Sequence, residues 1–127
     1  MIEVGMEGKS ESVVTEGNTA KTVGSGSLEV FATPMMVALM ENAAINAINL
    51  PEDQTSVGTY LDVNHLAATP VGMKVRAIAR VVEVKERLIV YYIEAFDEKE
   101  KIGEGKHERF IVNHEKFMLK ANAKLIR

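Results

Sequence analysis

The sequence contains no cysteine and no tryptophan, and three of its 127 residues are proline. Without cysteine there is no disulfide framework and no thiol nucleophile, and a cytoplasmic location is the default expectation. No apolar run is long enough to span a bilayer, and Glu3 and Glu7 argue against an ordinary signal peptide. The net charge of −3 provides no electrostatic footprint for nucleic acid. We therefore expect a protein that binds neither membranes nor nucleic acid.

Common cofactor and catalytic motifs are missing as well. The three histidines lack the spacing of a metal site, so no metal is predicted. The segment 103–108, GEGKHE, begins like a dinucleotide-binding fingerprint, but it ends in glutamate and precedes a strand. Gly103 and Gly105 are better explained as places where the core helix approaches a strand. No G-x-S-x-G nucleophile elbow is present.

Hydrophobic residues make up 46% of the chain and charged residues 26%, as in ordinary globular proteins. The length predicts one domain over residues 1–127. The longest apolar segment, residues 31–50, predicts a helix over 34–50. Thr33 suits the N-cap position, and Pro34 suits the first helical position, where no N–H is needed. Apolar side chains nearly surround this helix, which indicates a core position.

The rest of the chain indicates extended structure, because polar and apolar residues alternate along it. The first extended segment is broken at Gly17-Asn18, residues 85–86 close a hairpin, and a short helix follows the last strand. A strand that is apolar on both sides, 88–96, suggests that both sheet faces are covered and that the protein dimerises. The predicted class is α+β, a curved antiparallel sheet of about five strands around one long helix. The predicted segments are strands 10–23, 57–67, 73–84, 88–96 and 102–112, and helix 114–125.

Three polar residues are predicted to point into this core. Glu41 is the only charge in the long helix and lies among apolar neighbours, so it is either functional or paired, with Arg109 or His65 as the partner. His65 lies on the apolar face of its strand, where a satisfied core histidine is commoner than a catalytic one. Thr33 is explained by helix capping alone. Thr33 and Glu41 lie about 12 Å apart along the helix, too far for direct contact within one chain.

Over residues 10–120, several motifs together resemble the fluoroacetyl-CoA thioesterase-like family of hotdog proteins. The string HLAATPVGM at 65–73 is the most specific part. The resemblance implies a hotdog fold, a homodimer with a tetramer as the alternative assembly, and hydrolysis of small acyl-CoA thioesters at the subunit interface. It implies no separate cofactor, because coenzyme A is part of the substrate. The matching motifs are Phe31-Ala32-Thr33-Pro34, the helix with Glu41, Val57-Gly58-Thr59, 64–73 and Gly103-x-Gly105-x-His107-x-Arg109.

Carried onto this chain, the family's catalytic residues fall on Thr33, Glu41 and His65. The resemblance also implies that Gly58 presents its backbone N–H to the thioester carbonyl and that Arg109 lies near the site. Phe31 is the only aromatic residue close to the position where the fluoroacetyl-specific member carries lid phenylalanines; this chain has GSGSL at 24–28 instead. Hydrolysis is therefore better supported than fluoroacetyl selectivity.

Two alternatives to the enzyme remain open at this point. A non-catalytic acyl-CoA-binding hotdog module would need no inward-facing glutamate. A purely structural dimer would seal Glu41 in an ion pair with no cleft beside it.

Overall fold

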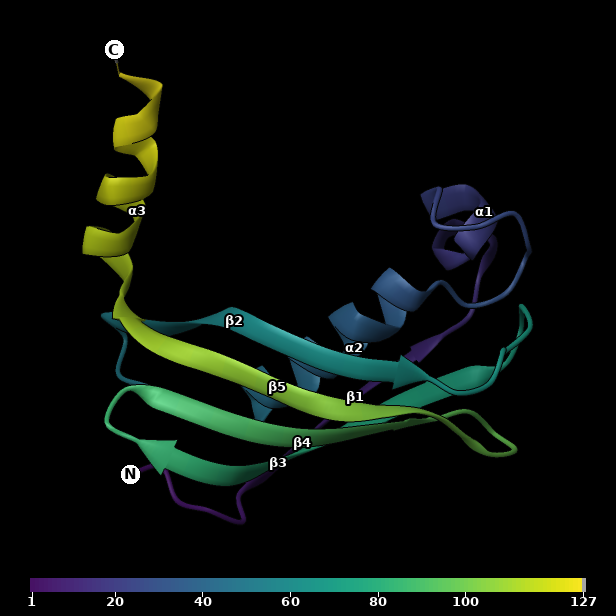
Figure 1. Ribbon diagram of the computed structural model, residues 1–127, viewed down its shortest axis with the longest axis horizontal. Coiled ribbons are helices and arrows are strands. Elements are labelled where there is room, and N and C mark those ends of the chain that lie inside the picture. The colour runs from purple at the N-terminus through teal and green to yellow at the C-terminus, as the bar shows by residue number, and fades with distance from the viewer. Residues whose placement is uncertain (127) are drawn as a thin grey trace.

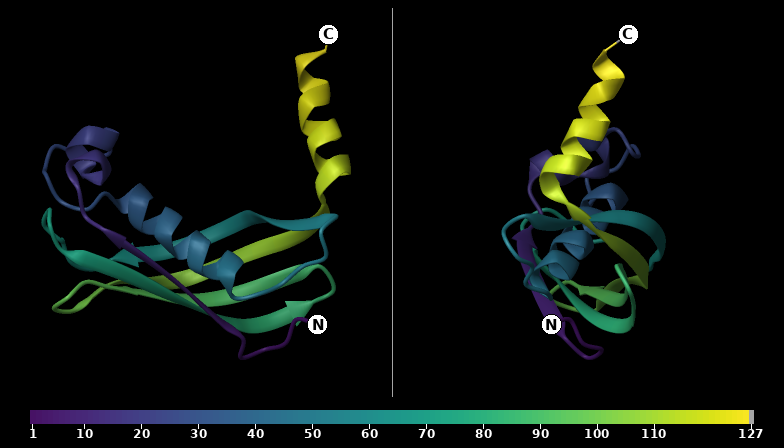
Figure 2. Two further views of the ribbon diagram at one scale, coloured as in Figure 1. Left: turned by 180° about the vertical axis from the view of Figure 1, so that it is seen from behind. Right: turned by 90° about the vertical axis from the view of Figure 1, so that its left-hand side faces the viewer.

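The computed structural model describes residues 1–126, which form one curved antiparallel sheet around a helix (Figure 1). The strand order is β1-β3-β4-β5-β2, so β1 and β2 are the edge strands. The end-on view in Figure 2 shows the central helix, α2 (Thr33–Asn46), inside the curl of the sheet. The α+β prediction is confirmed. The strands are β1 (Glu7–Val13), β2 (Gln54–His65), β3 (Lys74–Lys85), β4 (Leu88–Phe96) and β5 (Lys101–Asn113).

The central helix, α2 (Thr33–Asn46), is shorter than predicted and is capped differently. Thr33 is its first residue, and the N-cap is Ala32, which makes no side-chain capping bond; the predicted capping role of Thr33 is therefore wrong. The helix ends four residues before the predicted Leu50. Its buried side chains lie on the face towards the sheet, whereas Ile45 on the opposite face is 46% exposed. Within one chain, the helix is thus wrapped on one side only.

The N-terminal region departs most from the prediction. β1 begins at Glu7, inside the expected lead-in, and residues after Val13 form a 3-10 turn, η1 (Glu16–Asn18), and a short helix, α1 (Ala20–Val23). The helix forms because the Thr19 side chain accepts from Thr22 N–H and Gly24 takes the left-handed conformation at its end. The expected extended segment up to Val23 is wrong.

β2 starts three residues earlier than predicted, and its register with β5 shifts between Gly58 and Tyr60. This bulge interrupts the regular alternation expected along residues 57–67. Tyr60, just after the bulge, is 46% exposed at the sheet edge. The hairpin between β3 and β4 turns at Glu86-Arg87, one residue later than expected, with Lys85 paired to Leu88.

The core lies between α2 and the concave face of the sheet. A Cβ on Gly103 would lie 2.5 Å from Met36 Sδ, so the predicted close approach of the core helix to this strand is confirmed. At Gly105 the close neighbour is the backbone of β2 instead. The C-terminal helix, α3 (His114–Asn122), continues into η2 (Ala123–Leu125) and rises away from the sheet at the end opposite α1 (Figures 1 and 2). No helix within residues 1–126 is both long and apolar enough to cross a membrane.

Candidate active site

Thr33 and His65 meet at one end of the sheet. Thr33 opens α2 and His65 closes β2, and Thr33 Oγ1 and His65 Nδ1 are hydrogen-bonded at 2.6 Å. The second ring nitrogen, His65 Nε2, is buried and has no hydrogen-bond partner in residues 1–126. Burial lowers the pKa of His65, with a smaller opposing effect from the Ala67 backbone. His65 is therefore held as a neutral imidazole beside a hydroxyl group.

This pair lines an open pocket of about 340 Å³. Phe31, which is 2% exposed, forms part of the wall. The wall contains no charged residue, so the pocket suits an uncharged group. The remaining lining residues come from α1, the connection that follows it and the segment after β2 (Ala20, Ser25, Val30, Leu66, Ala67, Ala68).

Glu41 lies elsewhere on α2, outside the walls of that pocket. Its Oε2 lies 3.5 Å from Arg109 Nη1, so the ion pair is formed with one of the two partners that the sequence left open. The Glu41 side chain is 35% exposed, whereas that of Arg109 is 6% exposed. A Cβ on Gly58 would lie only 2.8 Å from Glu41 Oε2, so glycine at this position leaves room for the carboxylate. Glu41 thus combines a structural ion pair with access to solvent.

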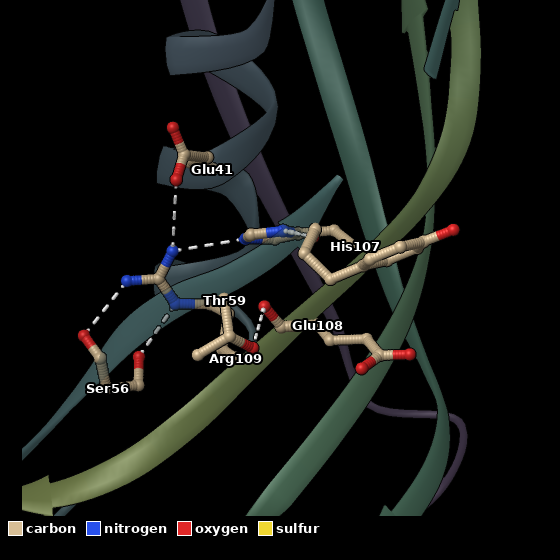
Figure 3. A network of polar contacts seen from close by, with 7 residues as sticks. Glu41, Ser56, Thr59, His107, Glu108 and Arg109 are labelled. Atoms are coloured by element: carbon tan, nitrogen blue, oxygen red, sulfur yellow. Dashed lines mark hydrogen bonds and ion pairs between the residues drawn. The ribbon is translucent and has the colours of Figure 1, made fainter. Parts of the chain in front are cut away.

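Arg109 is held on several sides, as Figure 3 shows. Its Nε donates to Ser56 Oγ at 2.8 Å, and Nη2 donates to the Ser56 carbonyl at 2.9 Å. Its Nη1 lies 3.1 Å from His107 Nε2. Burial lowers the pKa of Arg109, and the Glu41 charge opposes this. The guanidinium is therefore fixed in place before any ligand arrives.

The structure brings the predicted residues together in two groups: Thr33, His65 and Phe31 in one, and Glu41, Gly58 and Arg109 in the other. No hydrogen bond or ion pair among residues 1–126 joins Thr33 to Glu41. This agrees with the separation expected from their places on one helix.

Comparisons with known proteins identify the family. The model of the family described as fluoroacetyl-CoA-specific thioesterase matches residues 14–115. The chain belongs to this thioesterase family. The predicted enzyme class, thioester hydrolysis of an acyl-CoA, is the one that the family carries, and the predicted resemblance is confirmed.

Three relatives illustrate this membership. The fluoroacetyl-CoA thioesterase of Streptantibioticus cattleyicolor is 41% identical over 98 residues, covering 76% of this chain and 70% of the relative. A threonine-to-serine mutant of fluoroacetyl-CoA FlK in complex with acetyl-CoA superposes with a TM-score of 0.91 at 34% identity, over 97% of this chain and 98% of that one. A hot-dog-like protein from Thermanaerovibrio acidaminovorans gives a TM-score of 0.86 at 22% identity, over 97% and 93% of the two chains. These superpositions confirm the hotdog fold.

In this thioesterase, the contacts of His107 and Ser56 with Arg109 were not predicted from the sequence. Strand alternation did place His107 on the same face as Arg109, and His107 is fully buried. Its contact with Arg109 runs along β5, whereas the contacts of Arg109 with Ser56 reach across to β2. A buried histidine two residues before a buried arginine was the available signal.

Proposed function

We propose that the protein hydrolyses the thioester of a small acyl-CoA to the free acid and coenzyme A, at a site completed by a second copy of the chain. The observation that carries the proposal is the 2.6 Å contact of Thr33 with His65, beside an uncharged pocket at the N-terminus of α2. The FlK mutant bound to acetyl-CoA supports a short acyl group. The proposed catalytic residues are Thr33, Glu41 and His65.

His65 supplies the base. A lowered pKa keeps the imidazole neutral near pH 7, and it accepts the proton of the attacking oxygen. Attack forms the new carbon–oxygen bond, the carbon–sulfur bond breaks, and its electron pair leaves on the coenzyme A sulfur, which takes up a proton. One water is consumed for each acid and thiol formed. Thr33 orients the attacking water or is itself the nucleophile.

Glu41 and Gly58 supply the second half of the site. We propose that the Gly58 N–H stabilises the oxyanion and that Glu41 acts as base or nucleophile. Deleting one oxyanion donor costs about 3 kcal/mol in enzymes where this has been measured. Because the two groups lie apart within one chain, a dimer that sets one subunit's helix against the other's strand would bring them together.

Two surfaces support the dimer. β2 is an edge strand with β5 as its one strand neighbour within residues 1–126, and it exposes Tyr60 and Leu61. A long apolar edge is a template for pairing with another chain. The solvent-facing side of α2 exposes Ile45, which a partner's helix would cover. A tetramer and a cytoplasmic location remain predictions.

The test is thiol release from a panel of short acyl-CoAs by wild type and by Glu41→Gln, with the state of assembly measured by light scattering. We expect turnover of at least one short acyl-CoA by a wild-type dimer, and a kcat about 100-fold lower, a residual rate that can still be measured, in a folded Glu41→Gln variant. Glu83→Gln, on the exposed side of β3, is the matched control. Tight acyl-CoA binding without turnover would instead identify a binding module, and equal activity in both proteins would remove Glu41 from the chemistry.

A further inference from the structure

Both ring nitrogens of His107 are engaged by other groups. Nδ1 lies 2.8 Å from the Tyr60 carbonyl oxygen, which can only accept, so Nδ1 carries the hydrogen and donates it. Nε2 then accepts from Arg109 Nη1 at 3.1 Å. The ring is 0% exposed and stacks on Tyr91, with centroids 6.0 Å apart. His107 is therefore a neutral imidazole with a single defined tautomer.

The first of these bonds holds the β2 bulge. Gly58 precedes the bulge and Tyr60 follows it, and the Tyr60 carbonyl accepts from His107. On the other side of Gly58, the Ser56 carbonyl accepts from Arg109 Nη2. Two neighbouring inward side chains of β5, His107 and Arg109, thus bond to backbone carbonyls on both sides of Gly58. Figure 3 shows the bonds on the Ser56 side.

The second bond fixes the direction of the arginine. Arg109 Nη1 carries two hydrogens; one is directed at His107 Nε2, and Glu41 Oε2 lies 3.5 Å from the same nitrogen. A Cβ on Gly58 would meet Glu41 Oε2, His107 Cε1 and Arg109 Nη1, all within 3.4 Å. These groups pack so closely around Gly58 that a shift of the imidazole moves the arginine and with it the carboxylate.

We propose that His107 is a positioning residue for the thioesterase site: through Tyr60 it sets the Gly58 backbone, and through Arg109 it sets the Glu41 carboxylate. The proposal rests on the proposed function, in which Gly58 and Glu41 act on the thioester. If His107 served only for packing, the stacking of its ring on Tyr91 would be enough, and that contact uses neither ring nitrogen.

Two substitutions separate the two bonds. In His107→Asn, the shorter amide keeps an N–H near the Tyr60 carbonyl and leaves Arg109 without its acceptor. In His107→Gln, the amide oxygen reaches towards Arg109 and the donor to Tyr60 is lost. Each is made in wild type and in Glu41→Gln, and acetyl-CoA hydrolysis and thermal unfolding are measured. His114→Asn, on the exposed first turn of α3, is the matched control.

We expect His107→Asn to lower kcat about 10- to 100-fold, since misplacing a catalytic group by about 1 Å can cost about 100-fold, with KM changed less than about twofold. In the Glu41→Gln background, the same substitution should lower kcat less than about threefold, because residues that act through one another are not additive. His107→Gln should lower kcat in both backgrounds, because the bond that it removes, to the Tyr60 carbonyl, positions Gly58 and not Glu41. A purely structural histidine would give the same loss in both backgrounds for both substitutions.

The proposal is overturned if folded His107→Asn keeps kcat within about twofold of wild type, or if its loss is equal in both backgrounds. Should neither variant fold, nitrogen NMR of the wild-type histidines decides: a neutral ring with hydrogen on Nδ1 supports the network, and hydrogen on Nε2 overturns it. Wild type that hydrolyses no acyl-CoA would contradict the proposed function, and the NMR tautomer would still test the bonds around His107.

Discussion

His65 and His107 lie on adjacent strands, and burial lowers the pKa of both, yet their surroundings differ. His65 has one nitrogen on a threonine hydroxyl and the other without a partner in residues 1–126. His107 has both nitrogens bonded, one to a carbonyl and one to an arginine. A lowered pKa alone therefore does not distinguish a histidine that does chemistry from one that holds a structure.

The difference lies in what protonation would disrupt. A proton on His107 Nε2 would replace the acceptor of Arg109 with a second donor and place two cations together. A proton on His65 Nε2 meets no competing donor, so His65 can gain and lose a proton without breaking the network around Glu41. This contrast supports the proposal that His65, and not His107, is the base.

The largest effect should come from His65→Gln. Removal of the base should lower kcat for acetyl-CoA about 10³-fold, within the range for general-base residues. The free energy of unfolding should change by less than about 1 kcal/mol, because His65 makes one side-chain hydrogen bond. Thiol release and urea unfolding check both values. Unchanged turnover would exclude His65 as the base.

Gly58→Ala tests how closely the group formed by Glu41, Gly58 and Arg109 is packed. A Cβ 2.8 Å from Glu41 Oε2 and 3.2 Å from His107 Cε1 must displace the flexible carboxylate first. We expect kcat to fall about 10- to 100-fold, since misplacement by about 1 Å is costly to catalysis. Overpacking should cost about 1–3 kcal/mol of stability. The control is Gly17→Ala, whose Cβ would find its nearest neighbour at 3.7 Å; equal losses in both variants would contradict the packing argument.

The two histidines should also shape stability against pH. Both folded-state pKa values lie below the ordinary 6.5, so on acidification the unfolded chain takes up protons first. The free energy of unfolding is therefore independent of these groups above about pH 6.5 and falls below it, by up to about 1.4 kcal/mol per pH unit for each histidine. His65→Gln and His107→Gln should each flatten this acid slope in urea titrations between about pH 5 and pH 7.5. A slope equal to wild type in both variants would show that neither pKa is lowered.

Local sequence signals predicted the positions of helices and strands better than the contacts made by residues at their ends. Strand 88–96 was predicted to the residue because most of its residues are β-branched or aromatic and charged turns bound it. Thr33 was predicted to cap α2, yet its hydroxyl bonds to His65, 32 residues away. A tertiary partner that lies so far along the chain leaves no local signal, and the same residue type suits both roles.

The N-terminal error has a similar origin. Thr19, Thr22 and Val23 favour extended structure by intrinsic propensity. The capping bond from Thr22 N–H to Thr19 and the left-handed Gly24 outweigh that preference over one short helix. The bulge after Gly58 could not be predicted either. An extra residue in one strand becomes visible only when the pairing with the partner strand is known.

For the candidate site, resemblance identified more than patterns did. Helix periodicity and strand alternation predicted that Glu41 and His65 face the core, and helix capping placed Thr33 beside them; in the structure Thr33 is exposed and the other two are only partly buried. The family motif related the three residues to one reaction. The division into two groups, and the bonds of Arg109 to Ser56, depend on register between β2 and β5. That register is set by long-range pairing, which one sequence does not specify.

The smallest effect should come from Ser56→Ala, which removes one acceptor at the edge of the arginine network. Arg109 Nε would lose its 2.8 Å bond, while Nη2 keeps the Ser56 carbonyl and Nη1 keeps His107. We expect a loss of about 1 kcal/mol in the free energy of unfolding, typical of one hydrogen bond. Because the contact with Glu41 is retained, kcat should fall less than about threefold.

Ser12→Ala, on exposed β1, is the control for Ser56→Ala. Urea unfolding and acetyl-CoA turnover of the two variants give the comparison. If Ser56→Ala lowered kcat as far as His65→Gln, the arginine network could not be regarded as support for the site. Arg109 itself would then have to touch the substrate, and the contrast between the two histidines would need a different physical basis.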